Sequence, residues 1–129
     1  MPDRELYSEE THRDGDRIRP GGQPAFMWSC GVQLTALVAA TNLDRSAYEK
    51  RMKAYGDALD SYWIDHDGLG GYNVLPHSGP DRYYDDNAWM VLAFSEAYEV
   101  TKDRKQLDRA VETMKFVLSG EDEKLGGGL

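Results

Sequence analysis

Two adjacent carboxylic acids, Asp85 and Asp86, stand where a glycine- and proline-rich stretch gives way to a helical pattern. Aspartate is common at helix N-termini, because its carboxylate caps free N–H groups and is stabilised by the helix dipole. The same arrangement can do chemistry. Consecutive helical residues point about 100° apart, so the two carboxyl groups would lie on the order of 5 to 6 Å apart, close to the ~5–5.5 Å of a retaining glycosidase. The pair is therefore either a helix cap or a pair of catalytic carboxylates.

The residues around this pair are of the types that bind sugars. Aromatic rings stack on the apolar face of a pyranose, and side-chain amides form hydrogen bonds with its hydroxyls. The alternative for each aromatic residue is ordinary packing in the core. The candidate substrate-binding residues are Tyr72, Asn73, Tyr83, Tyr84, Asn87 and Trp89, with His77 and Arg82 as further polar partners.

Four helical patterns surround the candidate pair. Apolar residues recur at helical spacing over residues 24–41, 46–64, 85–101 and 104–119. The first and third patterns are apolar over a wide arc, which indicates helices buried on several sides, whereas the second and fourth keep a charged face. The order inner, outer, inner, outer predicts an all-α fold of two antiparallel helical hairpins, the arrangement of helical arrays and toroids. No strand is expected.

Two segments lie outside these helices. Residues 1–23 are polar and end in a Pro-Gly-Gly turn, so we expect a poorly ordered lead or a surface loop. The helical domain then covers residues 24–129. Residues 65–84 are too rich in glycine and proline for a regular element, and a loop of about 20 residues inside a compact domain is usually functional. This loop leads directly into the aspartate pair.

Composition argues against several classes of function. The 129-residue chain has a formal net charge of −8 and scattered basic residues, so we expect neither a nucleic-acid-binding nor an anionic-membrane surface. No apolar run is long enough for a membrane span. Cys30 is the single cysteine and lies in an apolar helical pattern, which favours a buried thiol. Asp65-His66-Asp67-Gly68 begins like a calcium loop, but Pro76 stands where the final Glu is required, so we expect a turn and no metal site.

Five strings of residues occur in order between Phe26 and Leu129. They are Trp28-Ser29-x-Gly31-Val32-x-Leu34, Gly70-Gly71-Tyr72, Tyr83-Tyr84-Asp85-Asp86-Asn87-Ala88-Trp89, Ala97-Tyr98-x-x-Thr101 and Leu125-Gly126-Gly127-Gly128. Together they resemble glycoside hydrolase family 76, the α-1,6-mannanases. The string that contains the aspartate pair is the most specific of the five.

This resemblance implies an (α/α)6 toroid and retaining endo-hydrolysis of α-1,6-mannoside chains. It implies α-mannan or a manno-oligosaccharide as the binding partner, and no cofactor. Carried over by position, Asp85 is the nucleophile and Asp86 is the general acid/base. The local chemistry agrees, because helix N–H groups favour one ionised carboxylate, while burial and a like-charged neighbour favour a proton on the other. Action on a cell-wall mannan implies an extracellular or cell-surface protein, although the N-terminus shows no signal-peptide pattern.

Length separates this chain from that family fold. Four helices are expected here and twelve in the toroid, so we infer a fragment, a truncated gene product or a chain that self-associates through uncovered faces of its inner helices. Two other functions stay open. One is a non-catalytic helical-repeat module that binds a glycan or a protein. The other is a different (α/α)6 sugar enzyme, such as an epimerase or an unsaturated-uronyl hydrolase. That enzyme would need histidine chemistry, and the three histidines, His12, His66 and His77, lie outside the helix cores.

Overall fold

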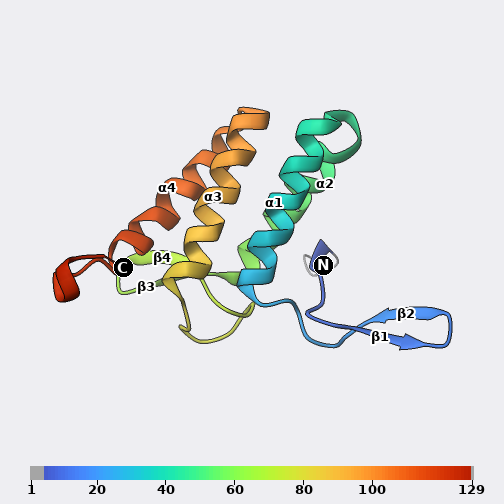
Figure 1. The fold of residues 1–129 in the computed structure, drawn as a ribbon, viewed down its shortest axis with the longest axis horizontal. Coiled ribbons are helices and arrows are strands. Elements are labelled where there is room, and N and C mark those ends of the chain that lie inside the picture. Colours follow the sequence, from blue (N-terminus) through green and yellow to red (C-terminus); the bar gives the residue numbers. More distant parts are fainter. Residues whose placement is uncertain (1–4, 129) are drawn as a thin grey trace.

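Four helices dominate the computed structural model, which describes residues 5–128. They are α1 (Met27–Leu43), α2 (Arg45–Ala58), α3 (Tyr84–Thr101) and α4 (Arg104–Leu118). α1 packs against α2 and against α3, and α3 also packs against α4. As Figure 1 shows, α1 and α3 lie in one layer, and α2 and α4 lie in the layer behind it. The mostly helical architecture of two hairpins confirms the predicted fold class.

Short polar turns set the boundaries within each hairpin. Asp44 follows the last residue of α1, and its carboxylate accepts a hydrogen bond from the backbone N–H of Ala47, which caps α2. α3 ends at Thr101, and its C-cap residue, Lys102, has a left-handed backbone with a φ of 57°. Asp103 then caps α4 by accepting a hydrogen bond from the backbone N–H of Lys105. Because each connection is so short, the helices that it joins run antiparallel.

Two short β-hairpins accompany the helices, so the expectation of no strand is wrong. They pair β1 (Thr11–Asp14) with β2 (Arg17–Pro20), and β3 (Trp63–His66) with β4 (Leu69–Tyr72), both antiparallel. Two-residue turns build both hairpins. Gly15 has a φ of 59° in the first turn, and Asp67 and Gly68 have φ values of 54° and 76° in the second. Positive φ values at these positions match the twist of paired strands, which is why Asp-Gly is a strong hairpin signal.

The second hairpin also shortens the second helix. The predicted helix over residues 46–64 ends as α2 at Ala58, a 3₁₀ helix follows at Leu59–Tyr62, and β3 then begins. Pairing with β4 draws Trp63 and Ile64 out of the helical pattern. The loop predicted over residues 65–84 correspondingly contains the end of β3 and all of β4.

The first residues that the structure describes pack on the helices. The ring of Tyr7 meets that of Tyr55 edge-on at 5.1 Å, and its hydroxyl accepts a hydrogen bond from Arg51 at 2.9 Å. The backbone N–H of Ala25 donates to the carbonyl of Tyr7 at 3.0 Å. β1 and β2, by contrast, are exposed along their whole length. The boundary between a lead and a helical domain at residues 23 and 24 stays a prediction.

The core lies between the two helical layers. Its largest fully buried apolar side chains are Tyr55, Tyr62, Tyr72, Phe94, Met27, Leu34, Met52, Leu59 and Met90. Cys30 is buried as predicted, and burial raises the pKa of its thiol. Among the described helices, none is long and apolar enough to cross a membrane.

The inner helices approach closely but leave part of their apolar surface open. A Cβ atom at Gly31 of α1 would lie 3.1 Å from the Cβ of Trp89 on α3, so glycine permits the close approach. Trp28 and Val32 of α1 and Leu92 of α3 are about half exposed. The described residues therefore leave the apolar face that these side chains form uncovered.

Candidate active site

Asp85 and Asp86 occupy the first turn of α3. The N-cap residue is Tyr83, which has an extended backbone and makes no side-chain cap hydrogen bond, so neither aspartate is the N-cap. Both carboxylates lie in the part of a helix where backbone N–H groups have no intrahelical acceptor and where negative charge is favoured. Asp85 is exposed to solvent and Asp86 is half-buried. The two neighbouring acids therefore differ in environment.

The carboxyl group of Asp86 is shifted towards its protonated form. Burial raises its pKa above the ordinary value, and the negative charges of Asp85 and Asp81 raise the pKa further. A half-buried acid beside an exposed acid is the asymmetry that acid/base chemistry with two carboxyl groups requires.

An open hollow lies beside the exposed aspartate. It has a volume of about 490 Å³ and is lined by Tyr83, Tyr84, Asp85 and Ala88. Trp89 follows Asp85 by four residues, so it lies one turn further along the same helical face, and it is also exposed. Three predicted aromatic residues thus surround Asp85 on the surface.

Tyr84 connects the start of α3 to the end of α4. Its ring stacks on Phe116 with centroids 4.9 Å apart, and a Cβ atom at Gly120 would lie 2.8 Å from the same ring. The guanidinium of Arg82 also packs on the ring of Phe116, at 4.3 Å, and donates a hydrogen bond to the carbonyl of Leu69 at 2.6 Å. This cluster fixes the junction between the loop and α3.

Asn87 joins β4 to the first turn of α3. Its Oδ1 accepts a hydrogen bond from the backbone N–H of Tyr72 at 2.7 Å, and its Nδ2 donates to the carbonyl of Tyr72 at 2.9 Å. Nδ2 also donates to the carbonyl of Tyr83 at 2.8 Å. The side chain of Asn87 is fully buried, and its amide forms hydrogen bonds with backbone groups of the protein itself.

Asn73 organises the loop before the aspartate pair. Its Oδ1 accepts a hydrogen bond from the backbone N–H of Asp81 at 2.7 Å. Its Nδ2 donates to the carbonyl of Ser78 at 3.0 Å and also to the carbonyl of Gly79. Asn73 is fully buried. By fixing the main chain at Asp81, it helps to place a third carboxylate near Asp86.

The structure therefore divides the predicted substrate-binding residues into two groups. Tyr83, Tyr84 and Trp89 are exposed beside Asp85. The other three, Tyr72, Asn73 and Asn87, are buried and hold the loop and strand that support α3. Their side chains are therefore absent from the exposed surface beside Asp85. Asp81 could not be predicted as a neighbour of Asp86, because its position depends on how Asn73 folds the loop.

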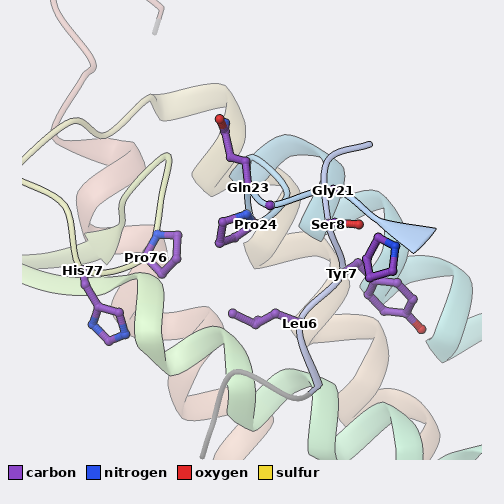
Figure 2. Close-up of a pocket in the computed structure, with 10 residues that line it drawn as sticks. Leu6, Tyr7, Ser8, Gly21, Gln23, Pro24, Pro76 and His77 are labelled. Atoms are coloured by element: carbon purple, nitrogen blue, oxygen red, sulfur yellow. The ribbon is translucent and has the colours of Figure 1, made fainter. Parts of the chain in front are cut away.

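A larger hollow, of about 590 Å³, shares none of its lining residues with the hollow at Asp85. Figure 2 shows Leu6 and Tyr7 of the N-terminal segment on one side of it, and Pro76 and His77 of the loop on the other. The other lining residues are Ser8, Pro20, Gly21, Gly22, Gln23 and Pro24. Since no carboxylic acid is among the described residues that line it, it does not compete with the aspartate pair as a hydrolytic site.

Comparison with models of protein families matches residues 5–129 to glycosyl hydrolase family 76. The chain belongs to this family. The match confirms the resemblance found in the sequence. No curated protein sequence is significantly similar to the chain.

Solved structures of family 76 proteins share the fold of this chain. An α-mannanase from Bacteroides thetaiotaomicron is 31% identical over 98% of the chain, with a TM-score of 0.80. A mannosidase from strain VPI-5482 of the same species is 26% identical over 96% of the chain, with a TM-score of 0.74. A glycoside hydrolase from a bovine strain is 26% identical over 99%, with a TM-score of 0.73.

These relatives are much longer than the chain. The matched regions make up 36%, 36% and 30% of the three solved chains, so this chain spans about a third of their length. Its four helices therefore correspond to part of the (α/α)6 toroid of family 76.

Proposed function

We propose that Asp85 and Asp86 are the catalytic pair of a retaining glycoside hydrolase that cleaves α-1,6-mannoside linkages within a mannan chain. The observation that carries this proposal is the difference between the two acids. Asp85 is exposed beside a hollow with aromatic walls, and Asp86 is half-buried with a raised pKa. Family membership supports it, and the names of two relatives, an α-mannanase and a mannosidase, support the sugar.

Each acid has a role that suits its environment. The ionised carboxylate of Asp85 attacks the anomeric carbon, and the bond from that carbon to the leaving oxygen breaks. Asp86 gives its proton to the leaving oxygen at the same step. Asp86 then takes a proton from water, the water oxygen attacks the anomeric carbon, and the bond to Asp85 breaks. A raised pKa keeps a proton on Asp86 for the first step.

The aromatic residues provide the surface on which the sugar lies. Tyr83 precedes Asp85 in the sequence and Trp89 follows it, and both side chains are exposed to solvent. Apolar faces of aromatic rings stack on pyranose rings. One face of the Tyr84 ring stacks on Phe116, which restrains the ring, while another part of the side chain is exposed to solvent. A ring that is already held in place loses little conformational entropy when a sugar binds to it.

The first experiment measures release of reducing ends from linear α-1,6-mannan by the chain and by Asp85→Asn and Asp86→Asn. Each substitution is expected to reduce cleavage on the order of 10²- to 10⁴-fold or more. Asp16→Asn, in the exposed turn between β1 and β2, is the matched control and should cleave normally. Cleavage that survives both active-site substitutions would reject the proposal.

A second substrate separates the two roles. A mannoside with a good leaving group, such as dinitrophenolate, needs no protonation of the leaving oxygen. Asp86→Asn should therefore form the covalent intermediate from this substrate at a near-normal rate, whereas Asp85→Asn should not. The opposite result would exchange the roles of the two residues.

One observation favours a second candidate function, a module that binds mannan without cleaving it. The described residues that line the hollow at Asp85 all belong to residues 83–88, so one short segment provides its walls. Binding of mannan with equal affinity by the chain and by both Asp→Asn variants, without release of reducing ends, would favour this function over hydrolysis.

A further inference from the structure

A second pocket lies between α4, the 3₁₀ helix that follows α2, and the β3–β4 hairpin, and it shares no lining residue with the hollow at Asp85. It has a volume of about 500 Å³, within the range of small-molecule sites. One wall is formed by Asp60, which follows the end of α2. The other wall belongs to α4 and consists of Lys105, Asp108, Arg109 and Glu112. The β3–β4 hairpin contributes Trp63 and Tyr72. Both walls belong to described residues of this chain, unlike the one-sided hollow at Asp85.

An unpartnered hydroxyl group belongs to this pocket. Tyr72 is 1% exposed, and its phenol oxygen has no hydrogen-bond partner among the described residues. Burial raises the pKa of this phenol, so it keeps its proton. Within the same pocket, the charge of Arg109 lowers this pKa and the charge of Asp60 raises it, and burial has the largest effect. A buried hydroxyl without a hydrogen-bond partner destabilises the fold, and a hydroxyl group of a ligand could form the missing hydrogen bond.

The indole of Trp63 provides a rigid apolar surface. Its ring meets that of Tyr72 edge-on at 5.1 Å. It also covers Gly70 so closely that a Cβ atom there would overlap with the indole. Trp63 is half-buried and lines the pocket, so part of its ring is available to a ligand.

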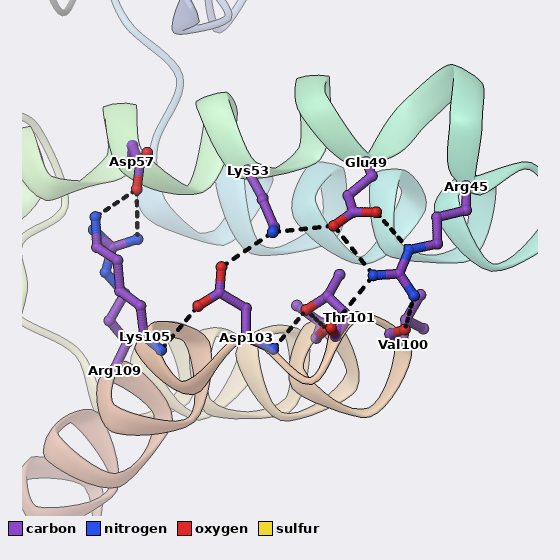
Figure 3. A network of polar contacts seen from close by, with 10 residues as sticks. Arg45, Glu49, Lys53, Asp57, Val100, Thr101, Asp103, Lys105 and Arg109 are labelled. Carbon is purple, nitrogen blue, oxygen red and sulfur yellow. Dashed lines mark hydrogen bonds and ion pairs between the residues drawn. The ribbon is translucent and has the colours of Figure 1, made fainter.

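The charged groups around the pocket are already paired with opposite charges. The pairs are Arg109–Asp60, Lys105–Asp57, Asp108–Arg104 and Glu112–Lys115. Figure 3 shows Lys105 and Arg109 directed from α4 towards Asp57 of α2. A charged ligand would have to compete with these pairs. A neutral ligand with several hydroxyl groups can instead accept hydrogen bonds from the cations and donate to the carboxylates.

We propose that this pocket binds one pyranose unit of a neutral saccharide at a non-catalytic site. The ring of the sugar packs on Trp63, and one of its hydroxyl groups pairs with the phenol of Tyr72. The main chain of Tyr72 is bonded to Asn87, so a sugar held here also contacts the strand that supports the first turn of α3. The site goes beyond the proposed hydrolysis and does not depend on it.

The test is a titration followed by NMR of the indole N–H groups, with mannose and α-1,6-mannobiose as probes. It uses the Asp85→Asn chain, so that cleavage plays no part and failure of the proposed hydrolysis does not affect the result. The indole signal of Trp63, assigned with Trp63→Phe, should shift saturably. Tyr72→Phe should weaken this binding on the order of 3- to 10-fold, because it removes one hydrogen bond. It removes only an unpartnered hydroxyl, so the fold should persist.

Tyr55→Phe is the matched control. It also removes a buried hydroxyl that has no hydrogen-bond partner within residues 5–128, but Tyr55 is not among the described residues that line this pocket, so affinity should be unchanged. No saturable shift of Trp63 with either sugar would overturn the proposal. Equal weakening by both Tyr→Phe substitutions would overturn it as well. A shift caused by free arginine or phosphate, but by neither sugar, would show a site for a charged ligand and would also overturn it.

Discussion

The side chain of Asn87 and the main chain of Tyr72 form two reciprocal hydrogen bonds, in which Oδ1 accepts at 2.7 Å and Nδ2 donates at 2.9 Å. Tyr72 is the last residue of β4, and Asn87 directly follows Asp86 in α3. The pair thus ties the β3–β4 hairpin to the turn of helix that carries both candidate catalytic acids.

Asn87→Ala should remove this connection. It would leave the backbone N–H and carbonyl groups of Tyr72 buried without partners, which is expected to lower the free energy of unfolding by about 2–3 kcal/mol. Urea unfolding measures the change. Asn42→Ala, at an exposed position in the last turn of α1, is the control and should shift stability by less than about 0.5 kcal/mol. Equal stability of the two variants would contradict a structural role for Asn87.

Gly70→Ala should displace the indole of Trp63, because a Cβ atom at Gly70 overlaps with that ring. Overpacking of this kind is expected to cost about 1–3 kcal/mol of unfolding free energy and to change tryptophan fluorescence. Gly79→Ala tests the same substitution in open space, since a Cβ there meets no atom of the described residues within 4 Å. If the two variants unfold at the same urea concentration, the indole of Trp63 does not pack closely against Gly70 in the folded chain.

Asp86→Asn should stabilise the chain at neutral pH. A carboxyl group whose pKa is higher in the folded chain than in the unfolded chain disfavours folding once it ionises, so stability falls as pH rises through the folded pKa. The amide carries no charge, so the midpoint of thermal unfolding should be higher than in the unmodified chain near pH 7. This increase in the unfolding midpoint should disappear below about pH 3, where Asp86 is protonated in both the folded and the unfolded chain. A lower midpoint at neutral pH would contradict the raised pKa.

Glu49 should make the ion-pair network between α2 and α4 sensitive to acid. Glu49 lies between Arg45 and Lys53, and Lys53 also reaches Asp103 at 3.2 Å, as Figure 3 shows. Hydrogen bonds from Arg45 and Lys53 lower the pKa of Glu49 from 4.5 to about 2. Its contribution to stability is therefore present above about pH 4.5 and is lost as the pH falls through about 2.

Glu49→Gln tests this behaviour. The difference in unfolding midpoint between this variant and the unmodified chain should shrink on acidification and on addition of salt, which screens exposed pairs. Glu96→Gln, at an exposed position of α3, is the control. A difference that does not vary between pH 7 and pH 2 would rule out the ion pair as its source.

The exposed apolar face of α1 and α3 should promote self-association. Trp28, Val32 and Leu92 are about half exposed, and exposed apolar side chains on packed helices usually mark an interface. We propose that a second copy of the chain covers it. Val32→Lys should then lower the mass measured by sedimentation, whereas Val111→Lys on the outer helix α4, where Val111 is equally exposed, should not. A monomer at all concentrations would contradict this proposal.

Local pattern in the sequence was enough to predict the helices and the position of the aspartate pair. The apolar period of α1, α3 and α4 is a property of neighbouring residues, and so is the change from a glycine-rich loop to a helix before Asp85. The string from Tyr83 to Trp89 was also sufficient for the family resemblance that the comparison confirms. The turn at Asp67 and Gly68 was equally local and was predicted as a turn, but the two strands that it joins were not predicted.

Tertiary structure alone decided which residues of the loop are buried. Tyr72 and Tyr83 have the same side chain, yet one lies beneath the helices and the other lies at the surface. Burial and hydrogen-bond partners depend on elements far apart in the chain, so the sequence could not show that Asn87 would bind β4 or that Asn73 would bring Asp81 near Asp86. The chemical types of the site residues follow from the sequence, and their separate roles follow from long-range packing.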